Sequence, residues 1–235
     1  MPCNSNRSPG RNHNRNHNQT PTENHGGSPL NPLNRSANID ESQNTSVWVS
    51  NLPKDCTIHQ LLAPIRQVGK IFFVHINPPN ETFATSAAKI TFWDRPSTEK
   101  FLRLVKDGKI TIGGLQPAVR MNRIRAAPQP ASNRSRVLVL WGSPSVVDMK
   151  VLEPLFRSEI EFEIDEVKEM MWYGERRLEI RFGSHRAQAS RAEQMMRVLK
   201  GGRTTEYAAA NLTPEQRIFL CLVRILWGSD PCELP

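Results

Sequence analysis

Val47-Trp48-Val49-Ser50-Asn51-Leu52 is the stretch of sequence that decides the fold. Val47 and Val49 alternate with more variable residues, as in a β-strand that buries one face. Asn51-Leu52-Pro53 then marks the end of this strand. The stretch therefore predicts a half-buried strand with Trp48 on its other face.

The segments after this strand alternate between helix and strand patterns. Thr57 and Gln60 form a capping-box signature that begins a helix, and Gly69 closes it. Pro64 should kink or shorten that helix, because it removes one helical hydrogen bond. The following patterns predict strands at residues 71–76, 87–93 and 118–124, a turn at 77–80 and a helix at 97–106. The predicted order is strand, helix, strand, strand, helix, strand.

A constant shift of ninety residues relates this unit to a second one. The matched pairs are Val47 with Val137, Val49 with Val139, Leu62 with Leu152, Pro64 with Pro154, Ile90 with Ile180 and Phe92 with Phe182. A shift that holds across several elements indicates tandem copies. The second copy is expected to have strands at 136–141, 162–171 and 177–182 and helices at 148–156 and 186–199. Its last strand is faint: Tyr207 and its neighbours could supply one, although three alanines make a poor strand.

The segments around the two copies differ from them in composition. Residues 1–44 contain eleven Asn and five Pro with almost no large apolar side chains, which predicts a disordered head. The first domain is then expected at 45–126 and the second at 136–210. A short Pro/Ala/Ser linker at 127–135 joins them.

The tail at 211–235 has the pattern of an amphipathic helix. Thr213-Pro214-Glu215-Gln216 combines an N-cap, a proline at the first helical position and a capping-box Gln, and Gly228 suits the helix end. The expected apolar stripe consists of Ile218, Phe219, Leu222, Ile225 and Leu226. Such a helix needs a surface to cover. That surface could belong to the same chain, over Leu138 and Leu140, or to an external partner.

The composition narrows the class of protein. Lys and Arg number 31 and Asp and Glu 23, for a net charge of +8, which favours a polyanionic partner. The four cysteines form no Cys-x-x-Cys pair, no secretory signal begins the chain, and no apolar run could span a bilayer. No catalytic constellation, phosphate loop or metal pattern is present. We therefore expect an intracellular protein, nuclear or cytoplasmic, that is not an enzyme and uses no cofactor or metal.

The hexamer Val47 to Leu52, in this order of elements, resembles the first-strand motif of the RNA recognition motif (RRM) family. The resemblance implies an α+β fold of two ferredoxin-like βαββαβ sandwiches in tandem. It also implies that Trp48 offers a ring on which a base stacks and that Asn51 makes a polar contact. The family's second motif aligns with Thr85-Ser86-Ala87-Ala88-Lys89-Ile90-Thr91-Phe92. Ala87 and Lys89 occupy positions where the family has aromatic rings.

The missing rings require other contacts to RNA. Phe73 and His75 are expected to project onto the same sheet face as Lys89, and the last strand and its exit add Arg120, Arg123 and Arg125. Residues 46–126 carry twelve basic and five acidic side chains, a net charge of +7. The expected partner of this surface is therefore single-stranded RNA, bound by stacking and phosphate neutralisation.

The second copy lacks these features. We expect Leu138, Leu140, Arg177 and Glu179 on its open sheet face, with no stacking ring on those two strands. Residues 127–202 carry twelve basic and eleven acidic side chains, a net charge of +1. This copy is interpreted as a degenerate RRM that contacts protein, with the C-terminal helix as a second possible protein contact. The alternative for the whole chain is an RRM-fold adaptor that binds proteins and has no RNA affinity of its own.

Overall fold

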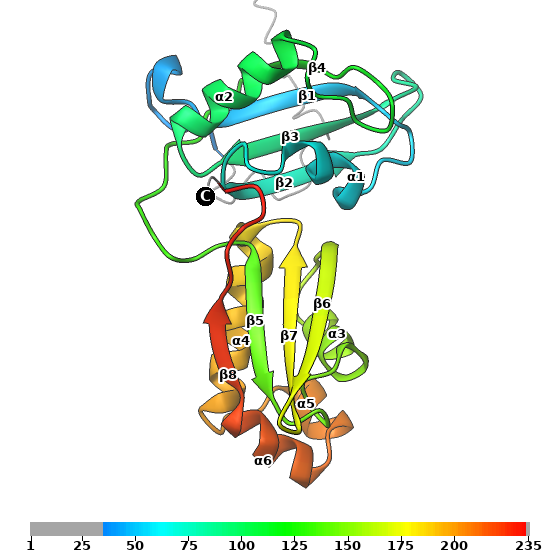
Figure 1. Ribbon diagram of the computed structural model, residues 1–235, viewed down its shortest axis with the longest axis vertical. Coiled ribbons are helices and arrows are strands. Elements are labelled where there is room, and N and C mark those ends of the chain that lie inside the picture. The colour runs from blue at the N-terminus through cyan, green and yellow to red at the C-terminus, as the bar shows by residue number, and fades with distance from the viewer. Residues whose placement is uncertain (1–34, 234–235) are drawn as a thin grey trace, which may run out of the picture.

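A computed structural model describes residues 35–233, which form two domains stacked along the long axis of the molecule (Figure 1). The head predicted to be disordered therefore lies mostly outside the described residues. The first domain consists of β1 (Ser46–Leu52), α1 (Ile58–Leu62), β2 (Ile71–Asn77), β3 (Ser86–Phe92), α2 (Arg95–Lys106) and β4 (Ala118–Met121). Its strands form one antiparallel sheet in the order β2-β3-β1-β4.

Local sequence signals explain where the first domain's helices begin and end. The Thr57 side chain accepts a hydrogen bond from the Gln60 backbone, and the Gln60 side chain accepts one from the Thr57 backbone, so the capping box forms as expected. Pro64 shortens the helix, since α1 stops at Leu62 and a 3₁₀ turn, η3 (Ala63–Ile65), follows. Asp94 caps α2 by accepting from the Ser97 backbone. Both helices pack on one face of the sheet and leave the other face open.

The second domain repeats this topology. Its elements are β5 (Val137–Gly142), α3 (Met149–Arg157), β6 (Ile164–Trp172), β7 (Glu175–Phe182), η4 (His185–Ala189), α4 (Ser190–Lys200), α5 (Glu206–Asn211), α6 (Pro214–Leu222) and β8 (Arg224–Trp227). Its sheet has the order β6-β7-β5-β8, which matches the first sheet strand for strand. The predicted α+β fold of two tandem βαββαβ sandwiches is confirmed.

The tail differs from the single helix that the sequence predicted. The capping box at Thr213 starts α6 as expected, but α6 ends at Leu222. Residues Arg224–Trp227 form β8, which pairs with β5 and supplies the fourth strand of the second sheet. Tyr207 lies in α5 and not in a strand. The helix prediction failed after Leu222 because the open edge of β5 binds this segment, a tertiary interaction that overrides the local helical pattern.

The side chains of β5 also face the opposite way from the prediction. Leu138 pairs with Ile180 and Leu140 pairs with Leu178, and both leucines lie fully buried in the core beneath the helices. In the first domain Ile90, the counterpart of Ile180, pairs with Val47. Leu138 is therefore the counterpart of Val47, so β5 follows β1 by 91 residues and not by 90. A slip of one residue moves every side chain of a strand to the other face. Leu138 and Leu140 are therefore core residues.

A buried ion network joins the two domains. Arg136 is fully buried, and its guanidinium donates to Asp230 and Asp165, each at 2.9 Å, and to the carbonyl of Phe182 at 2.8 Å. Burial alone would lower the pKa of Arg136, but Asp230, Cys232 and Asp165 raise it above its ordinary value. The guanidinium therefore stays charged inside the interface.

The two carboxylates of this network reach across to the first domain. Asp165 accepts hydrogen bonds from His59 Nδ1 at 2.9 Å and from Arg66, and Asp230 accepts from the backbone N–H of Ile71 at 2.9 Å. The segment after β8 runs back to the first domain (Figure 1) and inserts Cys232 into the core of that domain. Burial is the main reason that the pKa of Cys232 rises to about 12.

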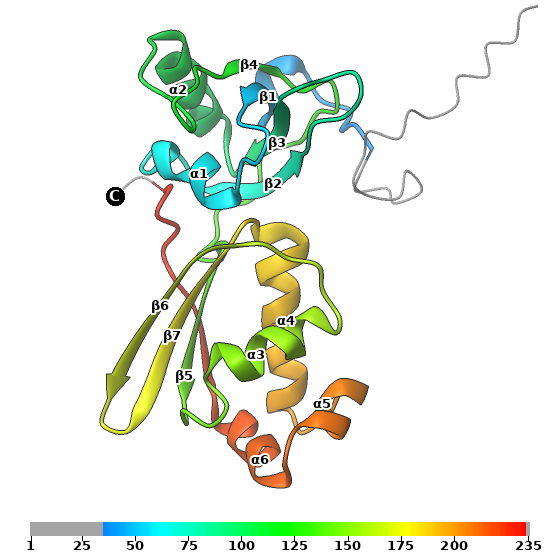
Figure 2. The ribbon, with the colours of Figure 1, turned by 90° about the vertical axis from the view of Figure 1, so that its right-hand side faces the viewer.

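The second domain also covers the free edge of β2. The Ser184 hydroxyl accepts from the Val74 N–H at 2.8 Å and donates to the Val74 carbonyl at 3.0 Å. Such pairing satisfies the edge groups that a sheet otherwise exposes. The helices of the two domains lie on opposite sides of the molecule (Figure 2), so the open sheet faces point in opposite directions. An RNA strand on one face therefore does not continue straight onto the other.

Candidate nucleic-acid interface

Four side chains form a row across the open face of the first sheet. Strand pairing places His75 beside Lys89, Lys89 beside Trp48, and Trp48 beside Arg120. The row runs from β2 through β3 and β1 to β4, while Val47 and Val49 point into the core. The alternation of a half-buried strand produces this division, as the sequence predicted.

The indole of Trp48 lies between two cations. Its side chain is half-buried, and its neighbours on the sheet are Lys89 and Arg120. Arg120 is exposed, and so is Arg123 beyond the end of β4. Among residues 35–233 none of these three cations forms an ion pair with a carboxylate. The face therefore presents an aromatic ring amid positive charge that no acidic side chain in this part of the chain neutralises.

Phe73 lies on β2 two residues before His75, on the same face of the sheet, and pairs with Thr91 on β3. The Lys89 ammonium lies 5.6 Å from the centre of the Phe73 ring, and the Arg186 guanidinium also lies 5.6 Å from it. Burial, followed by the charge of Arg186, lowers the pKa of Lys89. Burial, followed by the charge of Lys89, lowers the pKa of His75, so its imidazole is neutral at physiological pH.

The remaining predicted site residues occupy the margins of the face. Asn51 lies one residue before the end of β1 with a positive φ of 62°, and its side-chain amide donates to the Gln116 carbonyl at 2.8 Å. Arg125 forms an ion pair with Glu41 at 3.1 Å, and its backbone bonds to residues 36 and 37. The structure thus gathers Trp48, Phe73, His75, Lys89 and Arg120 on one face and places Asn51, Arg123 and Arg125 at its rim.

Sequence reasoning missed two aromatic or cationic groups near this face. Arg186 comes from the second domain and reaches Phe73 only because the domains pack together, so no local pattern could reveal it. Phe83 is 61 % exposed in the loop between β2 and β3. The sequence signal for Phe83 was an aromatic residue within an otherwise polar turn segment.

The open face of the second sheet is chemically different. Its cations are paired with carboxylates: Arg177 and Arg181 with Glu179, and Arg181 and Lys168 with Glu166. The expectation that no ring stands on its first and third strands is wrong, because Trp141 lies on this face. The Arg224 guanidinium stacks 4.4 Å from the centre of the Trp141 ring and itself pairs with Glu175. The ring is therefore already engaged by the protein.

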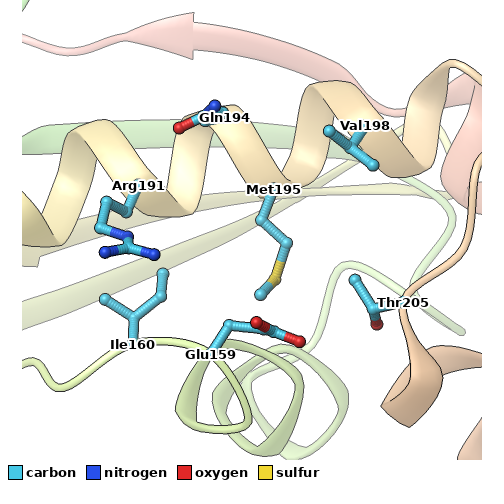
Figure 3. A pocket seen from close by; sticks show the side chains of 7 residues that line it. All are labelled: Glu159, Ile160, Arg191, Gln194, Met195, Val198 and Thr205. Carbon is cyan, nitrogen blue, oxygen red and sulfur yellow. The ribbon is translucent and has the colours of Figure 1, made fainter.

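A hollow lies on the helical side of the second domain. Figure 3 shows Arg191 and Met195 projecting from α4 toward Ile160 and Glu159, and Gln194, Val198 and Thr205 complete the lining. Within the described part of the chain, no cluster of three or more His, Cys, Asp or Glu could hold a metal ion. None of the helices between residues 35 and 233 has the length and hydrophobicity of a membrane span.

Comparisons with known proteins identify structures of similar fold. No family model and no curated protein sequence matches the chain. RNA recognition domains 1 and 2 of Sex-lethal from Drosophila melanogaster are 18 % identical, with a TM-score of 0.29, covering 79 % of this chain and 100 % of that one. The first two RRM domains of yeast Poly(U) Binding Protein (Pub1) give 18 %, a TM-score of 0.29, and coverage of 79 % and 99 %.

The chain has the tandem RRM fold. This assignment rests on the strand order and the order of elements in both sheets.

Proposed function

We propose that the chain belongs to the RRM family and binds single-stranded RNA on the open face of its first sheet. The observation that carries this proposal is the row across β2, β3, β1 and β4, in which Trp48 lies between Lys89 and Arg120. An indole accepts a base by stacking, and flanking cations neutralise the adjacent phosphates. The neutral imidazole of His75 adds a polar planar group beside Lys89.

The energetic contributions favour weak to moderate binding with strong salt dependence. A stacked base contributes about 1–3 kcal/mol, and the family's two octamer rings are replaced here by Ala87 and Lys89. Affinity must then depend more on phosphate contacts from Lys89, Arg120 and Arg123. Each neutralised phosphate of a single strand changes the slope of log K against log salt by about −0.7. Sequence selectivity is expected to be slight.

A titration of the full chain tests this proposal. A labelled single-stranded RNA of mixed sequence is titrated at low and moderate salt with wild type, Lys89→Glu and Arg191→Glu. Arg191 is exposed on α4 of the second domain and serves as the matched control, because its substitution changes the net charge equally at a position outside the first sheet. Binding that Lys89→Glu weakens far more than Arg191→Glu supports the proposal. Absence of binding by wild type at low salt refutes it.

A second function, contact with a protein partner, is favoured by exposed apolar residues of the second domain. The hairpin between β6 and β7 exposes Met170, Met171, Trp172 and Tyr173, with Tyr173 93 % exposed at the turn. Exposed apolar patches of this kind mark interaction sites. Proteins captured from the native source by wild type should be lost with Trp172→Glu and retained with Arg191→Glu. Equal recovery with both variants would contradict this role.

A further inference from the structure

Arg186 brings the second domain into contact with the open face of the first sheet. It lies in η4, between β7 and α4, and its guanidinium reaches to 5.6 Å from the centre of the Phe73 ring on β2. η4, which leads into α4, faces β2 in both views of the molecule (Figures 1 and 2). The helices of the second domain are on the same side as the open face of the first sheet, so η4 is positioned to extend that face.

The backbone on either side of Arg186 is fixed by specific contacts. Ser184 exchanges two hydrogen bonds with Val74, at 2.8 and 3.0 Å. The His185 ring donates from Nδ1 to the Ser135 carbonyl at 2.8 Å and packs against Trp93, with ring centres 5.1 Å apart. Ala187 adopts a left-handed backbone with φ 64°, a conformation that costs energy for a residue with a side chain. These contacts fix the position of Arg186, which therefore depends on how the two domains pack against each other.

We propose that Lys89 and Arg186 together bind one backbone phosphate of the RNA beside Phe73, so that the binding site is built from both domains. This inference rests on the proposed function. Two cations attracted to one aromatic ring repel each other, and an anion between them relieves that repulsion. The guanidinium offers several N–H donors and the ammonium three, which matches the oxygens of a phosphate. The second domain then contributes to RNA affinity although its own sheet face has its cations paired with carboxylates.

The charge at this position agrees with an anion site. In the described residues Lys89 has no carboxylate partner, and the presence of Arg186 lowers the pKa of its ammonium. A bound phosphate reverses this effect and favours the protonated lysine. A purely structural role for Arg186, in which the guanidinium only packs on Phe73, predicts no such coupling to an anion.

The test measures RNA affinity of the full chain as a function of salt, from about 50 to about 200 mM. The probe is a fluorescently labelled single-stranded RNA of mixed sequence. The variants are Arg186→Ala, Arg186→Lys and the matched control Arg191→Ala, which removes the same charge from an exposed position on α4. Urea denaturation of each variant checks that the domains remain folded.

Arg186→Ala is expected to weaken binding about tenfold, as for loss of a charged hydrogen bond, and to make the salt slope less negative by about 0.7. Arg186→Lys should retain the slope, and Arg191→Ala should change neither quantity. An affinity loss with an unchanged slope would show a packing role and overturn the inference. So would equal behaviour of Arg186→Ala and Arg191→Ala while Lys89→Glu still weakens binding, a result that leaves the proposed function intact. Absence of RNA binding by wild type would overturn both.

Discussion

Replacing Arg136 with methionine should weaken the packing of the two domains against each other and lower the free energy of unfolding. The substitution conserves much of the apolar volume but leaves Asp165 and Asp230, whose side chains are fully buried, without their shared cation. Asp165 keeps His59 and Arg66 as partners, whereas Asp230 keeps only backbone N–H donors among the described contacts. Removing one member of a buried ion pair costs about 3–5 kcal/mol, because the remaining charge is uncompensated.

An exposed arginine provides the reference for the expected change in the free energy of unfolding. Arg197 is 65 % exposed and pairs with Glu193 along α4, so Arg197→Met should change the free energy of unfolding by about 0.5 kcal/mol or less. Arg136→Met should lower it by about 3–5 kcal/mol. Urea denaturation measures both, with one probe in each domain, because two domains need not unfold together.

Hydrogen exchange of two backbone amides locates the effect at the interface. The N–H of Ile71 donates to Asp230, and the N–H of Val74 donates to Ser184. In Arg136→Met both amides should exchange about 100-fold faster or more, since each 1.4 kcal/mol is a factor of ten. A loss of less than about 1 kcal/mol with unchanged exchange at both amides would show that the network does not hold the domains together.

Three further predictions concern the second domain and the interface. Ile225→Ala should cost about 2 kcal/mol in urea denaturation because Ile225 packs against the core, whereas Leu226→Ala, 54 % exposed, should cost about 0.5 kcal/mol or less; equal costs would contradict the strand. Ser184→Ala should cost about 1–3 kcal/mol because it leaves the Val74 N–H unpaired, and faster exchange of that amide would show it. Burial lowers the pKa of His185, so the unfolded chain takes up a proton first: its contribution to stability is full above about pH 6.5 and falls as the pH drops below that value. His185→Gln should reduce this loss in denaturation midpoints, and an unchanged pH dependence would argue against it.

The sequence predicted best those elements whose signals are local. The capping boxes at Thr57 and Thr213 placed two helix starts, and the alternation around Trp48 placed the first strand and its faces. The ninety-residue repeat revealed the second domain. It also hid an insertion of one residue before β5, so Leu138 and Leu140 were assigned to the wrong face. Leu138 pairs with Ile180 as Val47 pairs with Ile90, so the counterpart of Val47 is Leu138 and not Val137.

The features that the sequence did not predict depend on contacts between distant segments. Arg224–Trp227 forms a strand because the edge of β5 binds it, although its apolar spacing continues the helical stripe of α6. Arg136 and Asp230 are 94 residues apart, and each looks like an ordinary surface charge in the sequence. The position of Arg186 depends on the same domain packing. None of these has a short-range signature.

The most direct test of the central claim compares two tryptophans in one RNA-binding measurement. Trp48 lies on the cationic face of the first sheet, and Trp172 is 55 % exposed at the hairpin of the second domain. In the full chain, Trp48→Ala should weaken binding of single-stranded RNA by about 1–3 kcal/mol, and Trp172→Ala should leave it unchanged. Equal affinities of the two variants, or a larger loss for Trp172→Ala, would contradict RNA binding on the first sheet.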